Sequence, residues 1–251
     1  MAAFSFAKLL TAPSTLGPLS GLPAFPEELD SCTIVGPKLS KLTSVALQFA
    51  ANHAACAGNP DSVAEPPEVV YLCQKGALED SQAVLAPGCT HASPALRCVK
   101  IRHLSSALEL QQYAGCLHLL PTRPAAVVVD GLSGFWQEGE RRSREAAQCR
   151  TLALLRNGVE AIRVQGGSCP LLVTDEGSGS TAAGATDSVY ILQRWTPLIL
   201  QVQGTARSGL TMRVHPACAA APQLPEQLRS VVISFSVQAS LSVTAVQHGG
   251  A

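Results

Sequence analysis

A segment near the start of the chain has the spacing of a loop that binds phosphate groups. The template is G-x-x-x-x-G-K-[ST]: glycines let backbone N–H groups approach the phosphates, the lysine reaches the terminal oxygens, and the hydroxyl holds magnesium. Residues 36–44 read GPKLSKLTS and fit this template without a gap between a predicted strand and a predicted helix. The residues expected to contact a nucleotide are Gly36, Pro37, Ser40, Lys41, Thr43 and Ser44.

The same segment departs from the template at two positions. Lys41 stands in place of the second glycine, and Leu42 stands in place of the lysine. A Cβ at position 41 obstructs the approach of the backbone to a phosphate, and loss of the lysine removes a charge-assisted contact. Lys38 or Lys41 could supply a replacement charge, because a lysine side chain is flexible. The sequence therefore predicts only weak binding of ATP and magnesium.

A second candidate site residue ends a strongly apolar run. Residues 127–130 read VVVD, so three valines would bury a strand and Asp130 would emerge at its carboxyl end. Magnesium sits at that edge of the sheet in nucleotide-binding folds of this kind. Thr43 and Asp130 are thus the predicted metal ligands.

The elements around these residues alternate between strands and helices. Buried or short strands are predicted at residues 31–35, 69–73, 97–102, 125–129 and 170–174. Helices are predicted at residues 44–53, 105–119 and 139–163. This alternation predicts an α/β fold with a mostly parallel central sheet covered by helices on both faces. A strand from residue 198 and a period-two pattern over 233–245, turning near 238–240, predict an antiparallel C-terminal edge.

Length and composition suit one α/β domain. The 251 residues carry zero net charge, 47% hydrophobic residues and 14% charged residues, which excludes a disordered chain, a coiled coil and a strongly basic chromatin-type protein. No apolar run reaches the roughly 18 residues that a membrane span needs. Residues 1–26 contain no acidic residue, so we expect a flexible N-terminal arm over 1–27 and a folded domain over 28–248.

The nine cysteines are scattered and form no CxxC motif. His53 with Cys56 and Cys116 with His118 are isolated pairs, without the second pair that a zinc site needs. This spacing predicts reduced core thiols and no zinc, which is typical of proteins of the cytosol or nucleus.

Together these segments resemble the RecA-type recombinase ATPases. Residues 36–50 look like the family's GPPGSGKTSLxxQxA, and residues 71–76 (YLCQKG) correspond to its YIDTEG segment, which carries the catalytic glutamate. Lys75 stands at the glutamate position. The resemblance implies a RecA-like P-loop NTPase fold with no catalytic residue at this position, and hence an inactive or weak ATPase.

A closer resemblance runs from about Cys98 to the end, within a match that covers roughly residues 30–247. It is carried by KIR at 100–102, the helix at 107–116, VVVDGL at 127–132, LQRW at 192–195 and the closing β-rich segment. These are similar to the recombinase-paralogue-like ATPase subunit that partners the SWIM-type zinc-finger protein in the Shu complex. The resemblance implies a nuclear role in homologous recombination and DNA repair. It also implies binding of single-stranded DNA, of the SWIM-type protein and of recombinases or their paralogues, and it allows self-association.

Two groups of basic residues are the DNA-binding candidates: Arg97, Lys100 and Arg102, and then Arg141 and Arg142 at the start of the long predicted helix. Clustered bases are needed to neutralise a phosphate backbone. Glu140 and Glu145 offset the second group, so a solvated helix face is the alternative explanation there.

Three further alternatives remain open at this point. The chain could be a DNA-stimulated ATPase with a rearranged lysine, or a RecA-like accessory subunit of the tRNA-modifying Elongator complex. The N-terminal arm could be an organelle transit peptide. Alternatively, its Phe4-Ser5-Phe6-Ala7 segment, which has the FxxA form of recombinase docking segments, could bind a neighbouring subunit.

Overall fold

The fold was analysed in a computed structural model of the whole chain. It describes residues 4–12, 24–38, 40–56, 68–90, 93–136, 141–166, 168–177, 189–207, 209–219 and 224–248. The side chains of Arg141 and Arg142 lie outside the described part.

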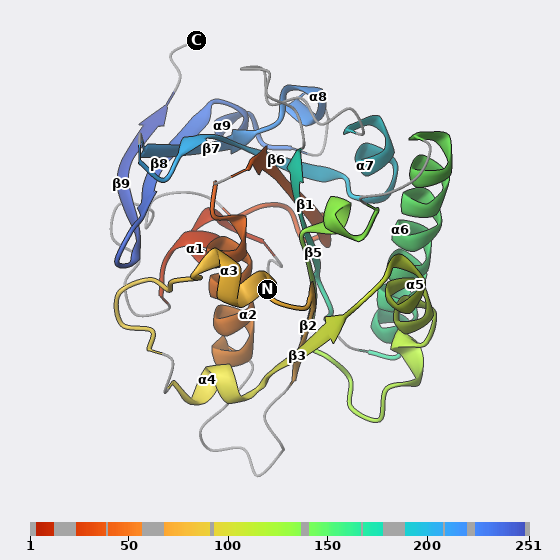
Figure 1. Cartoon of the computed structure of the whole chain (residues 1–251). Coiled ribbons are helices and arrows are strands. Elements are labelled where there is room, and N and C mark those ends of the chain that lie inside the picture. Colours follow the sequence, from red (N-terminus) through yellow and green to blue (C-terminus); the bar gives the residue numbers. More distant parts are fainter. Residues whose placement is uncertain are drawn as a thin grey trace.

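One nine-stranded sheet organises the molecule, in the order β3-β2-β4-β5-β1-β6-β7-β8-β9 (Figure 1). The parallel strands are β3 (Val99–Leu104), β2 (Val69–Gln74), β4 (Ala126–Asp130), β5 (Leu171–Gly177), β1 (Ser31–Pro37) and β6 (Leu198–Thr205). The antiparallel strands are β7 (Gly209–Val214), β8 (Val231–Val237) and β9 (Leu241–His248). The predicted α/β class, with a mostly parallel sheet and an antiparallel C-terminal edge, is confirmed.

Helices cover both faces of the parallel strands (Figure 1). One face carries α1 (Phe6–Leu10), α2 (Leu42–Cys56), α3 (Ala77–Ser81) and α4 (Pro94–Arg97). The other face carries α5 (Ala107–Gly115), α6 (Arg141–Val164) and α7 (Val189–Trp195). Because both faces are covered, β2 and β4 are buried along almost their whole length, as their continuous apolar sequences predict.

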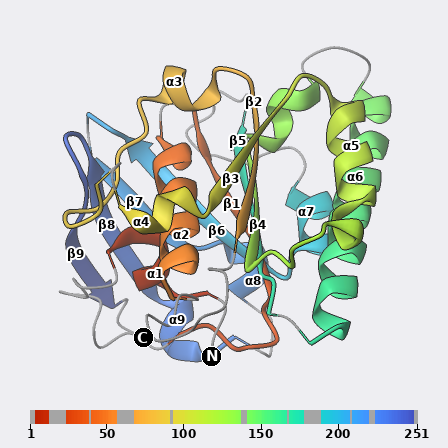
Figure 2. The ribbon, with the colours of Figure 1, turned by 90° about the horizontal axis from the view of Figure 1, so that it is seen from below.

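Shorter helical elements lie between these main elements. They are η2 (Leu117–Leu119), η3 (Leu132–Trp136), α8 (Pro216–Ala219) and α9 (Glu226–Arg229). Seen from below, α3 lies at one end of the sheet, whereas α8 and α9 lie at the opposite end (Figure 2). Among the described residues, no helix has the length and apolar character needed to cross a membrane.

The described part of the N-terminal segment is not a flexible arm. Phe4 is fully buried, and its ring stacks on Phe49 of α2 at a centroid distance of 5.2 Å. Asn52 of α2 donates hydrogen bonds of 2.7 Å to the carbonyl oxygens of Lys8 and Thr11. The expectation was wrong for residues 4–12 because apolar side chains at 4, 6, 9 and 10 give this acid-poor segment its own buried face.

Residues 24–27 also pack on the domain, because Phe25 is buried and its N–H donates to the Phe4 carbonyl at 3.1 Å. Phe4 of the FxxA segment is therefore packed inside this chain. Docking into another subunit would require this segment to be exposed. Residues 13–23 lie outside the described part.

Candidate functional site

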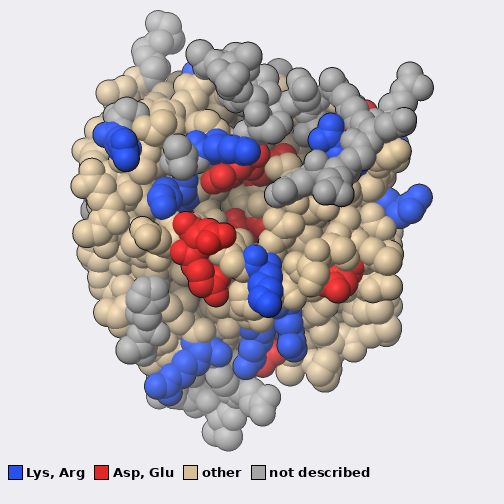
Figure 3. Space-filling view, in the orientation of Figure 1, with Lys and Arg blue, Asp and Glu red and all other residues tan. Residues whose placement is uncertain are grey.

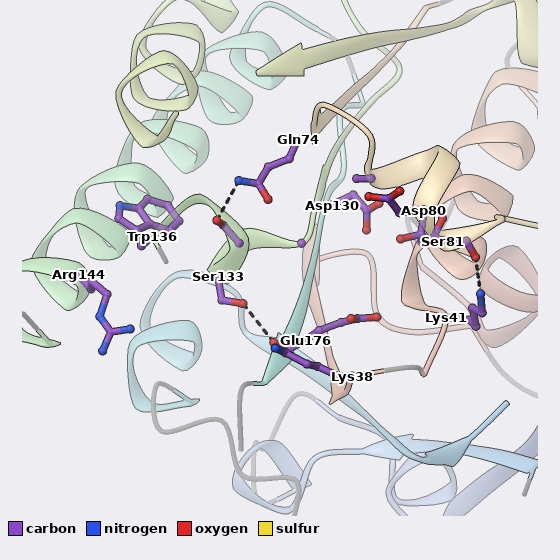
Figure 4. A pocket seen from close by; sticks show the side chains of 14 residues that line it. Lys38, Lys41, Gln74, Asp80, Ser81, Asp130, Ser133, Trp136, Arg144 and Glu176 are labelled. Carbon is purple, nitrogen blue, oxygen red and sulfur yellow. Dashed lines mark hydrogen bonds between the residues drawn. The ribbon is translucent and has the colours of Figure 1, made fainter. Parts of the chain in front are cut away.

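A pocket of about 620 Å³ lies at the carboxyl ends of β1, β2, β4 and β5. β1 continues into α2 on one face, whereas the neighbouring β5 leads toward α7 on the other, and a crevice forms where adjacent strands connect to opposite faces. Figure 3 shows this hollow near the centre of the view, with acidic side chains in and beside it and basic side chains around it. The lining includes Lys38, Lys41, Thr43, Asp130, Arg144 and Glu176 (Figure 4).

The β1–α2 loop (residues 36–44) keeps features of a phosphate-binding loop in its backbone. Lys41 has φ +56°, the left-handed conformation that glycine adopts most easily, at the position of the template's second glycine. At the first glycine, a Cβ added to Gly36 would lie 2.7 Å from Ser40 Oγ. The loop therefore retains the turn although one of the two glycines is replaced.

The loop positions its two lysines and Leu42 differently. Leu42 is fully buried in the core. The ammonium group of Lys41 donates to the carbonyl oxygen of Ser81, at the end of α3, at 2.5 Å. Lys38 is exposed at the pocket beside Glu176 (Figure 4). Lys38 and Lys41 thus both line the pocket, but the ammonium group of Lys41 is hydrogen-bonded to the end of α3.

Four of the predicted nucleotide contacts shape the loop and do not line the pocket: Gly36, Pro37, Ser40 and Ser44. Ser40 and Ser44 are fully buried. The Ser44 hydroxyl accepts the N–H of Val84 at 3.1 Å, so it fixes α2 against the segment that follows α3.

Asp130 lies at the floor of the pocket and is surrounded by hydroxyl groups. Tyr71 donates to its Oδ2 at 2.9 Å, Thr174 donates to its Oδ1 at 2.6 Å, and the Thr43 hydroxyl also bonds to it. Burial raises the pKa of Asp130 above its ordinary value, although these three hydroxyls oppose the shift. The structure therefore brings the two predicted metal ligands, Thr43 and Asp130, into contact.

Two carboxylates that sequence reasoning missed follow Thr174 on β5. The carboxylate of Glu176 accepts the backbone N–H of Leu42, and its pKa is raised first by burial and then by the charge of Asp130. Asp175 accepts the N–H of Ser133 at 3.0 Å at the start of η3, and burial raises its pKa also. Both follow an apolar run that predicts a parallel strand, which is the same signal that identified Asp130.

The end of β2 carries no acidic residue. Gln74 lines the pocket and donates from Nε2 to the carbonyl oxygen of Gly134 at 2.9 Å. Lys75, at the position where the recombinase resemblance places a glutamate, is exposed and is not part of the lining. The carboxylate nearest in sequence that does line the pocket is Asp80, on α3.

Arg144, from the first turns of α6, is a further pocket residue, which the sequence groups with Arg141 and Arg142 at the start of a basic helix and does not place in the pocket. Its Nε is buried and has no hydrogen-bond partner within the described part of the chain. The indole nitrogen of Trp136, another lining residue, is also buried without a hydrogen-bond partner among the described residues. The side of the pocket formed by η3 and α6 therefore holds two buried donors that no described residue satisfies.

The two predicted groups of DNA-binding residues lie at different ends of the sheet. Arg97, Lys100 and Arg102 are exposed along α4 and the edge strand β3, beginning at its amino end, and Lys100 pairs with Glu68 at 3.2 Å. Arg141 and Arg142 begin α6, close to the pocket at the carboxyl ends. The two groups are therefore separated in backbone position, and on the face in Figure 3 the described basic groups are separated by acidic and uncharged ones.

The described residues contain no group of three or more His, Cys, Asp or Glu side chains that could hold a metal ion. Eight cysteines of the described part are free thiols. No model of a protein family matches the chain, and a comparison with curated proteins finds no match either.

Proposed function

We propose that this chain is a RecA-like, ATPase-deficient subunit of a recombinase-paralogue complex of the Shu type. It would support homologous recombination in the nucleus by binding single-stranded DNA and partner proteins. The observation that carries the proposal is a pocket at the carboxyl ends of a parallel sheet, beside a loop with phosphate-binding spacing in which Leu42 stands in place of the lysine.

The placement of the pocket supports the RecA-like part of the proposal. A buried strand leads through the β1–α2 loop into a long helix, and the hydroxyl of Thr43 meets Asp130 from a neighbouring part of the sheet. The left-handed backbone at Lys41 is what a glycine-rich phosphate loop would have at that point.

The residues present fit magnesium-ATP poorly. Leu42 offers no charge, the Leu42 N–H is already bonded to Glu176, and Asp130 already accepts three hydroxyl donors. Thr43 and Asp130 would be the ligands of any magnesium bound here. Lys75, at the position of the glutamate that would activate water, carries no carboxylate and is not among the described lining residues.

An exposed apolar surface supports the binding of partner proteins. Large apolar side chains are exposed on the elements of one face of the sheet: Leu108, Leu119, Val164 and Tyr190. A partner that covered these elements would remove the four side chains from water. We propose that this face, formed by α5, η2, α6 and α7, contacts the SWIM-type zinc-finger protein or a recombinase paralogue.

Affinity purification with mass spectrometry from dividing cells tests the partner proposal. The tagged chain is expected to recover a SWIM-type protein and recombinase paralogues. A Leu119→Glu, Val164→Glu double variant should lose them, whereas Ile101→Glu, at an exposed apolar residue of the edge strand β3, should retain them. Recovery of Elongator subunits, or of no recombination factor, would overturn the proposal.

Turnover of radiolabelled ATP, with and without single-stranded DNA, tests the absence of ATPase activity. The wild type and an Asp130→Ala variant are expected to release phosphate at the same background rate. Turnover that rises with DNA and disappears in Asp130→Ala would instead establish the DNA-stimulated ATPase.

A further inference from the structure

The first N–H groups of α2 form the part of the pocket that is chemically suited to an anion. The first four N–H groups of a helix have no partner within the helix, and in loops of this shape they bind phosphate oxygens. In this chain the carboxylate of Glu176 accepts the N–H of Leu42. An acidic side chain of the protein thus stands where a phosphate oxygen would bind.

The sheet holds Glu176 in this position. Its Cα is paired with that of Gly36 across the β1–β5 ladder, directly beside the first residue of the loop. Its carbonyl oxygen accepts the hydroxyl of Ser133 at 3.2 Å. The side chain extends from this fixed backbone over the β1–α2 loop, next to Lys38 (Figure 4). The contact with Leu42 therefore follows from strand register, which a ligand cannot easily change.

The described part of the pocket lining carries equal numbers of basic and acidic side chains. The lining contains three basic side chains, Lys38, Lys41 and Arg144, and three acidic ones, Asp80, Asp130 and Glu176. A triphosphate would add several negative charges to this set and would have to displace Glu176 from Leu42. Like charges close together in a partly buried site disfavour one another strongly.

We infer that Glu176 is a specificity-determining residue, an anionic ligand built into the chain that occupies the β1–α2 loop and excludes polyphosphates from the pocket. This inference rests on the proposed function, because it concerns the same pocket. It assigns the weakness of nucleotide binding to one identifiable carboxylate in addition to the missing lysine.

Titration of the full-length chain with a fluorescent ATP analogue and magnesium, with inorganic triphosphate as competitor, tests this inference. Glu176→Gln removes the negative charge, and Glu176→Ala removes the whole carboxylate side chain. Both variants should bind the ATP analogue at least about tenfold more tightly than the wild type, because the ligand no longer has to displace a charged hydrogen-bond acceptor from the Leu42 N–H. Circular dichroism before titration establishes that each variant is folded.

Asp80→Asn is the matched control, because it removes one negative charge from the same pocket lining without vacating the Leu42 N–H. Its affinity should change by less than about a third of the Glu176→Gln change. The inference is overturned if neither Glu176 variant binds more tightly, or if Asp80→Asn gains as much. Recovery of partner proteins is measured separately on the same variants, so failure of the partner proposal and failure of this inference give different results.

Discussion

Buried aspartates at the two ends of the parallel sheet, Asp30 and Asp130, lie in opposite surroundings. Asp30 and Asp130 are both 4% exposed. Asp30 precedes β1 at the amino end and is ion-paired with Arg156 and Arg163 of α6. Asp130 ends β4 at the carboxyl end and is held by hydroxyl groups. A carboxylate with two guanidinium partners stabilises the fold, whereas one that burial leaves without a cation marks the end of the sheet where a ligand would bind.

Breaking the amino-end cluster should give the largest effect. Asp30→Ala leaves two arginines without their buried partner and should lower the free energy of unfolding by about 3 kcal/mol, as loss of one member of a buried ion pair does. Urea denaturation measures this loss. Glu160→Ala removes the exposed partner of Arg163 and should cost less than about 1 kcal/mol. Equal losses in the two variants would contradict the structural role of Asp30.

Filling the space at Gly36 should give the next largest effect, this time at the carboxyl end. Gly36→Ala places a Cβ 2.7 Å from Ser40 Oγ and 3.3 Å from Val202 Cβ, which should cost about 1–3 kcal/mol of stability. Adding Ser40→Ala removes the closest atom and should recover part of the loss. Thermal denaturation of the single and double variants checks this; a double variant no better than Gly36→Ala would contradict it.

Removing the charge of Asp130 should raise the free energy of unfolding, whereas Asp30→Ala should lower it. Because the pKa of Asp130 is raised in the folded protein, wild-type stability falls as the pH rises from the ordinary carboxyl pKa to the raised one. Asp130→Asn lacks this loss, so it should be more stable than the wild type at pH 7, and its advantage should shrink as the pH falls through the raised pKa. Because the charge of Asp130 also raises the pKa of Glu176, the difference between the two unfolding curves reports Asp130 together with its coupling to Glu176. An advantage that grows in acid would refute this assignment.

The smallest effect is expected at Ser40. Its buried hydroxyl has no hydrogen-bond partner among the described residues. Ser40→Ala removes an unsatisfied polar group and should stabilise the protein by about 1 kcal/mol. Denaturant unfolding should resolve the gain, and a loss of stability would show that the hydroxyl has a partner that the described residues do not include.

Much of the fold could be predicted because its strands carry direct signals. The apolar runs before Asp130 and Asp175 identify buried parallel strands, and the alternation around residues 233–245 identifies the β8–β9 hairpin, whose turn lies at 238–240. β7 was not predicted, because its six residues mix Thr and Arg with apolar residues and it is recognised only by pairing with β6 and β8.

The site could be predicted only in part, because side-chain direction depends on tertiary contacts. The sequence shows that Leu42 replaces a lysine, but the bond of Lys41 to Ser81 requires α3 to lie across the loop. The acidic pair Asp175 and Glu176 opens a stretch rich in Gly and Ser that resembles a surface loop. Only pairing with β1 extends β5 through these residues and directs Glu176 to the loop.

Helix α6 gives the molecule a rigid connection between its two ends. Arg144 near its start lines the pocket, and Arg163 near its end pairs with Asp30, about 28 Å away at 1.5 Å per residue. If a ligand moved Arg144 toward the pocket and α6 shifted with it as a rigid body, Arg163 would move relative to Asp30. The ion pair between these two residues would then be strained. The rates of amide hydrogen exchange around Asp30 would then change when a ligand occupies the pocket.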